Sequence, residues 1–302
     1  MPIDDPQGVS GTSFPKRSRV RGRLAVVTRN VVPLRKEPDH ASELVSQGLI
    51  GQPLVAEGGS KDWLFVQTWD TYRGWVHSQD LRLLDEGEQQ YASSGPVAVV
   101  RELFADVFVG STGEIITKTT ISAELEFTGS SGDVVEVRLP DGNTGCIRKH
   151  DAKLMDKSAA QTIWLPEPRK LIETAMRFIG VPYLWGGTSP FGLDCSGFVQ
   201  LVHKIHGVTL LRDAHMQASD PRGAKVDRAD LRAGDLVFFG KKREKKVTHV
   251  GMVIGGGRFI HSCGSLGVTI TPLDSPDYSG IFLFARRMRF ATLDPGGGAP
   301  EE

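Results

Sequence analysis

The chain has 302 residues, of which 39% are hydrophobic and 24% charged, with 36 Lys and Arg against 36 Asp and Glu. This length makes room for two or three domains and excludes a single small module. The balanced charge argues against nucleic acid as a partner. No apolar run approaches the ~18 residues of a membrane span, so we expect no membrane partner either.

A secretory signal needs an apolar core of about 7 to 15 residues. The basic stretch within residues 1–30 is not followed by one, and we expect a cytoplasmic protein, with export by a route that uses no such signal as the alternative. The three cysteines, Cys146, Cys195 and Cys263, lie far apart and form no CxxC pair. This pattern predicts neither a disulfide framework nor a zinc knuckle. We expect no cofactor and a monomer.

The first half of the chain predicts a repeated all-β module. Short strands are expected over 24–28, 51–56, 63–69 and 74–77, separated by glycine and aspartate turns. Leu54, Asp70 and Gly74 recur at one constant offset as Leu125, Asp141 and Gly145. We therefore predict an N-terminal extension over 1–23, barrels over 24–88 and 95–156, and a linker over 89–95. The second copy has Cys146 where the first has Trp75, and we interpret this cysteine as a small buried filler.

The second half predicts a different kind of unit. After a second linker over 156–168, apolar residues recur at helical spacing over 171–178 and 196–206. Strands are expected over 236–239, 247–254, 258–262 and 281–288, so helices precede an antiparallel sheet. We predict an α+β domain over 167–292 and a disordered tail over 293–302. His203 and His206 fall on the polar flank of the second helix, where we expect them to be exposed.

Cys195 stands directly at the predicted start of the second helix. The unpaired N–H groups and the positive dipole end of a helix start stabilise a thiolate and favour nucleophilic chemistry. Its spacing to Phe198 and Val202 puts it on the apolar face. The alternative is a buried structural cysteine, which is also the interpretation we favour for Cys263.

His249 and His261 flank the glycine turn 255–257 and are expected to be approximate cross-strand neighbours. Such a pair can serve a thiol, one imidazole taking its proton while the other fixes the tautomer of the first. Structural histidines and a metal site are the alternatives for this pair. No third ligand is near in the sequence to complete a metal site.

Five motifs occur in order: Pro182-Tyr183-Leu184-Trp185-Gly186-Gly187, Asp194-Cys195-Ser196-Gly197-Phe198, the run 231–239, His249-Val250-Gly251 and Ile260-His261. Over about 167–288 they resemble the NlpC-type cell-wall peptidases, which are papain-like. With two SH3-like barrels in front, the chain resembles the γ-D-glutamyl-L-diamino acid endopeptidases that require a free L-Ala amine. The resemblance implies hydrolysis of the bond between D-γ-glutamate and meso-diaminopimelate or lysine in peptidoglycan stem peptides, without metal or cofactor.

The resemblance also implies roles for individual residues. Cys195 would be the nucleophile, His249 the general base and His261 the residue that orients it, while Tyr183 would assist the oxyanion. The implied substrate-binding residues are Tyr72, Trp185, Asp194, Ser196, Arg212 and Asp213.

Each implied role has a structural alternative. Asp194 could act only as an N-cap, Tyr183 and Trp185 as core aromatics, and Arg212 with Asp213 as a solvated turn pair. The chain departs from the family pattern at Ala214, where a serine is expected, and at Val45, where a glutamate is expected. Glu43, two residues back on the same strand face, is the alternative acid.

Two other functions remain open at this stage. The barrels could tether a domain without activity to the cell wall, although Cys195, His249 and His261 are all present. The same three residues could also serve a papain-like amidase or acyltransferase acting on another amide.

Overall fold

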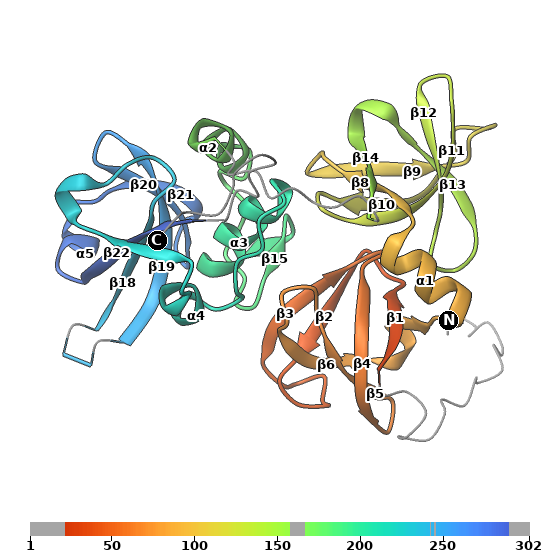
Figure 1. The fold of residues 1–302 in the computed structure, drawn as a ribbon, viewed down its shortest axis with the longest axis horizontal. Helices are drawn as coiled ribbons and strands as arrows, with labels where there is room; N and C mark the ends of the chain where they lie inside the picture. Colours follow the sequence, from red (N-terminus) through yellow and green to blue (C-terminus); the bar gives the residue numbers. More distant parts are fainter. Residues whose placement is uncertain (1–21, 158–166, 242, 245, 290–302) are drawn as a thin grey trace, which may run out of the picture.

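The computed structural model describes residues 22–157, 167–241, 243–244 and 246–289. The expected disordered tail over 293–302 and nearly all of the N-terminal extension lie outside these residues. Three units follow one another along the chain, two all-β and one α+β, as Figure 1 shows. This is the fold class expected from the sequence.

The first unit is a seven-stranded antiparallel sheet with the order β3-β2-β6-β5-β4-β1-β7. Inward and outward residues alternate along strands such as β2, so that one face supplies the apolar core. The strands are β1 (Arg23–Val27), β2 (Val31–Arg35), β3 (Leu44–Leu49), β4 (Pro53–Ser60), β5 (Trp63–Gln67), β6 (Arg73–His77) and β7 (Leu81–Leu83), with the 3₁₀ helix η2 (Ser78–Asp80) before the last.

The second unit repeats this topology, because its strand order β10-β9-β13-β12-β11-β8-β14 equals the first order shifted by one module. Cys146 on β13 pairs with Phe108 as Trp75 on β6 pairs with Arg35, and it is buried. The strands are β8 (Pro96–Val100), β9 (Phe104–Phe108), β10 (Ile115–Thr120), β11 (Glu124–Ser131), β12 (Val134–Arg138), β13 (Thr144–Arg148) and β14 (Ala152–Asp156), with η3 (Lys149–Asp151) before the last.

The predicted linker over 89–95 is not extended but largely helical. Helix α1 (Glu86–Ser94) begins at Asp85, whose side chain accepts from the backbone N–H of Glu88 while the Glu88 carboxylate accepts from that of Asp85. This capping box satisfies two N–H groups at the helix start. The polar composition of the segment therefore concealed a helix between the barrels.

The third unit has a six-stranded sheet of order β17-β22-β18-β19-β20-β21, with α2, α3 and α4 on one face and the short α5 on the other. Its helices are α2 (Pro168–Met176), α3 (Cys195–Ile205), α4 (Ala214–Ser219), α5 (Pro276–Ser279) and the 3₁₀ helix η4 (Arg228–Asp230). Its strands are β15 (Thr188–Ser189), β16 (Gly192–Leu193), β17 (Gly223–Val226), β18 (Leu236–Lys241), β19 (Lys246–Gly255), β20 (Arg258–Cys263), β21 (Gly267–Pro272) and β22 (Phe282–Met288).

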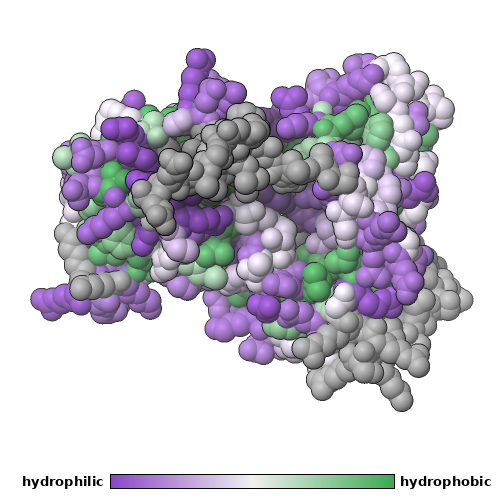
Figure 2. Space-filling model, viewed as in Figure 1, coloured by the Kyte–Doolittle hydropathy of each residue, from purple (hydrophilic) through white to green (hydrophobic). Residues whose placement is uncertain are grey.

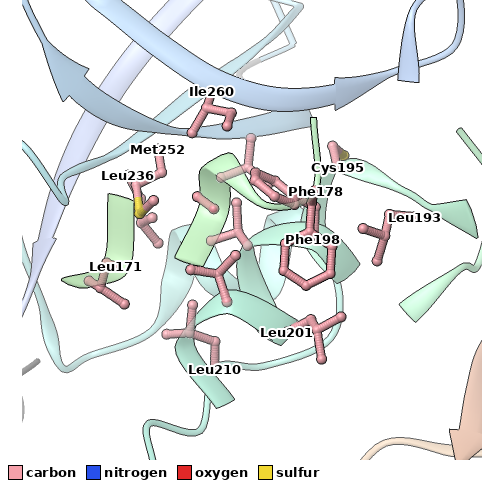
Figure 3. Packing of buried hydrophobic residues seen from close by; sticks show 14 of the residues in the cluster. Leu171, Phe178, Leu193, Cys195, Phe198, Leu201, Leu210, Leu236, Met252 and Ile260 are labelled. Carbon is pink, nitrogen blue, oxygen red and sulfur yellow. The ribbon is translucent and has the colours of Figure 1, made fainter. Parts of the chain in front are cut away.

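Helix α3 is central to this unit and is buried on every side over its first nine residues. Phe198 and Leu201 extend from it among Phe178, Met252 and Ile260, as Figure 3 shows. The expectation that His203 is exposed was wrong: it is 2% exposed and its Nδ1 bonds the carbonyl of Val199. His206 is half-buried, with its Nε2 2.9 Å from the Thr174 hydroxyl.

Both barrels contact helix α3, which explains why its polar flank is buried. The Gln200 amide donates to Asp70 of the first barrel over 2.6 Å. Lys204 lies 3.7 Å from Glu124 of the second barrel. The two side chains of each contact are largely buried. The helix that begins with Cys195 is therefore held in place by all three units.

Hydrophobic side chains on the face in Figure 2 form separate patches among hydrophilic ones. Within the described residues, no helix is both long and apolar enough to cross a bilayer.

Candidate active site

Cys195 is the first residue of α3 and is 8% exposed. Its thiol accepts hydrogen bonds from the backbone N–H groups of Ser196 and Val250, the latter on β19. The nucleophile candidate therefore lies between the start of a helix and the strand that carries His249. This is the arrangement that the sequence predicted for the helix start.

The expected lowering of the thiol pKa by the helix start is present but outweighed. Burial, followed by the Asp194 carboxylate, raises the pKa of Cys195 to about 12, although the two N–H groups act in the opposite direction. In the resting site the group is therefore a thiol, and an acceptor for its proton is required during attack.

Asp194 caps helix α3 and is saturated by protein donors. Its Oδ1 accepts from the N–H of Gly197 over 2.7 Å and from the Ser196 hydroxyl over 3.1 Å, and its Oδ2 accepts from the N–H of Gly186 over 3.0 Å. The Arg212 guanidinium donates to both oxygens, over 3.1 and 2.5 Å.

Arg212 is 1% exposed, and its bidentate pair with Asp194 holds its pKa above the ordinary value although burial opposes this. Its Nη1 also lies 3.2 Å from the Ser196 hydroxyl. Asp194, Ser196 and Arg212 thus form a buried network behind Cys195, so the N-cap role proposed as an alternative for Asp194 is present.

The two histidines meet as the glycine turn predicts, but diagonally rather than directly opposite. In the ladder that pairs Met252 with Ile260, the position across from His261 is Gly251. His249 Nε2 lies 2.9 Å from His261 Nδ1, with the rings at 89°. A Cβ atom at Gly251 would come within 2.5 Å of Phe259 and 3.1 Å of His261, so only glycine leaves room for this contact.

Burial keeps both imidazoles neutral at physiological pH. It lowers the pKa of His249 to about 4, although Asp194 acts in the opposite direction, and with the neighbouring His249 it lowers that of His261 to about 3. Because Nε2 of His249 contacts His261, Nδ1 is the nitrogen available to a thiol proton. The contact between the two rings is compatible with the expected roles of His249 as base and His261 as orienting residue, which stay predictions.

Tyr183 and Trp185 lie on the loop before Cys195. Tyr183 forms a backbone bridge with Leu193, and burial raises the pKa of its phenol. Trp185 is 62% exposed and donates its Nε1–H to Glu43 of the first barrel over 2.9 Å. The core-aromatic alternative does not describe Trp185, because an exposed indole held by a carboxylate forms part of a surface.

Gly186 follows at a positive φ of 74°, where a Cβ atom would lie 2.4 Å from the carbonyl oxygen of Leu44 on the barrel. This close approach packs the loop before Cys195 against the first barrel.

The first barrel also reaches the segment after α3. The Tyr72 hydroxyl donates to Asp213 Oδ2 over 3.1 Å. Burial, and next the Asp213 charge, raise the pKa of Tyr72. Ala214 opens α4 and Val45 packs against the barrel core, so neither supplies a polar group.

Two residues at the histidine pair were not identified from the sequence. His261 Nε2 lies 2.9 Å from the Thr271 hydroxyl on β21, and its Nδ1 lies 3.4 Å from the Tyr278 hydroxyl on α5. Tyr278 also packs edge-on against the His261 ring. The alternation Val268-Thr269-Ile270-Thr271 on β21 was the signal that could have identified this strand, and with it a threonine on the side of His261.

A third unidentified residue, Gln217 on α4, donates through Nε2 to the carbonyls of Ser196 and Leu211. Cys263 is partly exposed and near the Tyr278 hydroxyl. No cluster of three or more His, Cys, Asp or Glu side chains suited to a metal ion occurs in the part of the chain that the structure describes.

Comparisons with known proteins match the peptidase-like unit and the first barrel to two described families. Residues 180–287 match the family described as the NlpC/P60 family, and residues 34–81 match the bacterial dipeptidyl-peptidase SH3 domain. A γ-D-glutamyl-L-lysine dipeptidyl-peptidase of Bacillus cereus is 32% identical over 260 residues, which cover 82% of this chain and 76% of that protein.

Two further relatives span nearly their whole length. Dipeptidyl-peptidase 6 of Lysinibacillus sphaericus is 32% identical over 83% of this chain and 92% of its own. The crystal structure of an NlpC/P60 family protein from Bacillus cereus superposes with a TM-score of 0.79 at 27% identity, covering 88% of this chain and 99% of that one.

Proposed function

The chain belongs to the NlpC/P60 family of cysteine peptidases, and from this premise we propose that it hydrolyses the D-γ-glutamyl-L-diamino acid bond of peptidoglycan stem peptides that begin with a free L-Ala. The family expected from the sequence motifs is thereby confirmed. Relatives named as γ-D-glutamyl-L-lysine dipeptidyl-peptidases support this bond.

The proposed reaction begins with Cys195. As its sulfur attacks the γ-carbonyl carbon of D-glutamate, the thiol proton passes to His249 Nδ1 and the carbonyl oxygen becomes an oxyanion. The backbone N–H of Cys195 at the helix start and the Tyr183 hydroxyl are the proposed donors to this oxyanion. His249 then gives the proton to the departing amine of the diamino acid as the carbon–nitrogen bond breaks. Water hydrolyses the remaining thioester by the same route.

The observation that carries the substrate proposal is the contact between Tyr72 and Asp213. It places a tyrosine of the first barrel against a carboxylate on the segment that follows the nucleophile helix. A carboxylate in a half-buried position is suited to an ammonium group. An ammonium lies two residues before the scissile bond when the substrate starts with free L-Ala-γ-D-Glu.

Glu43 is a second acid on the barrel side. Its hydrogen bond from Trp185, followed by that from Lys36, lowers its pKa. Glu43 would also favour a substrate with a cationic N-terminus. It would take the place of the glutamate that the family pattern has at the position of Val45. The diamino acid itself, the cytoplasmic location and the monomeric state stay predictions.

Mass spectrometry of L-Ala-γ-D-Glu-diamino acid peptides tests the proposal. We expect release of the dipeptide L-Ala-γ-D-Glu from peptides with a free amine, and no release by the Cys195→Ala variant. If acetylated or muramyl-linked peptides are cleaved equally well, the free-amine requirement is wrong. If the peptides stay intact while other amides are cleaved or transferred, the amidase or acyltransferase alternative holds instead.

A further inference from the structure

The hydrogen bonds of the histidine pair extend to a further residue, Thr271, beyond the Cys195, His249 and His261 that the family resemblance implies. His249 Nε2 lies 2.9 Å from His261 Nδ1, and His261 Nε2 lies 2.9 Å from the hydroxyl of Thr271. His261 is 0% exposed. A buried imidazole nitrogen must find its hydrogen-bond partner within the protein, and the Thr271 hydroxyl is that partner for His261 Nε2.

The proposed reaction fixes which atom donates in each of the two hydrogen bonds, His249 to His261 and His261 to Thr271. Taking the thiol proton at Nδ1 requires His249 to carry its own proton on Nε2, where it donates to His261 Nδ1. His261 Nδ1 must then be unprotonated, and its proton must sit on Nε2. That proton points at Thr271 Oγ1, which accepts it.

The reverse arrangement would stop the reaction. A threonine hydroxyl can also donate, and if it donated to Nε2, His261 would carry its proton on Nδ1 and donate it to His249. His249 would then hold its proton on Nδ1, the nitrogen proposed to take the thiol proton, which would leave that proton without an acceptor.

We propose that Thr271 is a positioning residue of this relay, whose Oγ1 accepts the Nε2 proton of His261 and so keeps both imidazoles in the tautomers that the thiol attack needs. The inference rests on the proposed cysteine-peptidase chemistry. During attack His249 becomes positively charged, and the hydrogen bonds through His261 to Thr271 stabilise that charge.

The other groups around His249 and His261 do not supply this acceptor. Asp194 and Cys195 lie at the start of α3 on the thiol side. Tyr278 of α5 approaches His261 at Nδ1, the nitrogen already bonded to His249, at the longer distance of 3.4 Å. Its hydroxyl also bonds Cys263 on β20.

The test compares Thr271→Val, which keeps the shape but removes the acceptor, with Thr271→Ser, which keeps the acceptor. Thr144→Val, at an exposed position of β13 in the second barrel, makes the same change outside the peptidase domain and is the matched control. We expect Thr271→Val to lower kcat roughly 10-fold with KM within about 2-fold, and Thr271→Ser and Thr144→Val to stay within about 3-fold of the parent. Valine is well suited to a strand, and thermal unfolding verifies that each variant is folded.

Alkylation of Cys195 by iodoacetamide gives a second readout that needs no peptide substrate. Its rate against pH reports proton transfer to His249, and losing the acceptor should slow it in Thr271→Val and move the acid limb to lower pH. Equal rates and pH profiles for Thr271→Val and the parent would overturn the proposal, as would equal damage in Thr271→Ser. Should Cys195→Ala keep full peptidase activity, the proposed function itself would fail, which is a distinguishable result.

Nitrogen chemical shifts of ¹⁵N-labelled His261 observe the tautomer directly. We expect the Nε2-protonated form in the parent and in Thr271→Ser, and a mixture in Thr271→Val. A parent protein in which His261 is protonated on Nδ1 would contradict the assigned direction of the relay.

Discussion

The hydroxyl of Tyr72 lies 3.1 Å from a carboxylate oxygen of Asp213, although the two residues belong to different units of the chain. Tyr72 comes from the first barrel and Asp213 from the segment that begins α4 of the peptidase domain. The barrel therefore supplies part of the candidate substrate site rather than serving only as a tether.

The first prediction concerns the amine that Asp213 is proposed to bind. Asp213→Asn should reduce kcat/KM for free-amine peptides roughly 30-fold or more, because removing one partner of a charge-assisted contact typically costs ~2 to 5 kcal/mol. Acetylating the peptide in the parent enzyme should have a similar effect. Acetylated peptides should show little further loss with Asp213→Asn, and an equal loss on both peptides would mean that Asp213 acts on the fold instead.

The second prediction orders the catalytic residues. Cys195→Ala should abolish turnover by several orders of magnitude in a folded protein, because the covalent route is lost. His249→Ala should be nearly as severe, whereas His261→Ala should be milder because His261 orients the base. Steady-state kinetics on one peptide measure all three, and a harsher effect of His261→Ala than of His249→Ala would reverse the two roles.

The local chemistry of the site was predictable from the sequence. Cys195 at a helix start follows from the capping residue and the apolar spacing after it, and the histidine pair follows from the glycine turn between its strands. Such features depend on neighbours within a few residues. The repeat of the barrels was likewise visible as a constant offset and reappears as one strand order used twice.

Contacts between units could not be predicted in this way. His203 was expected on a solvated flank because a helix in a single domain usually has one, but both barrels cover α3 as well as the sheet. Thr271 meets His261 through the pairing of β20 with β21, which depends on a strand that the sequence analysis missed. In the first barrel, β2, β3 and β7 were also missed, because β2 contains a proline, β3 contains a glycine and β7 has only three residues.

The third prediction tests the ionic contact that joins α3 to the second barrel. Glu124 lies 2.8 Å from Lys157 and 3.7 Å from Lys204, and all three side chains are less than 20% exposed. Burial raises the pKa of Glu124, but the two lysines outweigh it and the net shift is downward. Lys204 also stands 4.6 Å above the Trp69 ring of the first barrel.

Glu124→Ala should therefore lower the free energy of unfolding by about 2 to 4 kcal/mol, because it leaves two buried lysines without their carboxylate. The control is Glu173→Ala, which breaks an exposed pair with Arg169 and should cost no more than about 0.5 kcal/mol. Urea unfolding measures both. Equal effects of the two substitutions would show that Glu124 contributes no more than a surface charge.

The fourth prediction follows from the buried His203. Burial lowers the pKa of His203 to about 4 in the folded protein, against about 6.5 when unfolded. The unfolded state therefore binds the proton more readily, so this contribution to stability is fully present above pH 6.5 and is lost as pH falls toward 4. Between pH 8 and pH 5 the loss from this one group is about 2 kcal/mol.

His203→Leu should remove that part of the pH dependence. Urea unfolding of the parent and of the variant at pH 8 and pH 5 gives the comparison, and the variant should lose about 2 kcal/mol less over this interval. His249 and His261 remain in both proteins and titrate in the same direction. An identical loss in both proteins would mean that His203 titrates normally in the folded state.

The most direct test uses an L-Ala-γ-D-Glu analogue in which a chloromethyl ketone replaces the scissile amide. Its chloromethylene carbon alkylates a nucleophile held beside the γ-carbonyl much faster than one elsewhere, with loss of chloride, and mass spectrometry of the digested protein locates the new bond. We predict a single label on Cys195, formed at least 10-fold faster by the free-amine reagent than by its acetylated form, with the difference lost in Asp213→Asn. A label on another residue, or equal rates for the two reagents with the parent enzyme, would contradict a cysteine peptidase that recognises a free N-terminal amine.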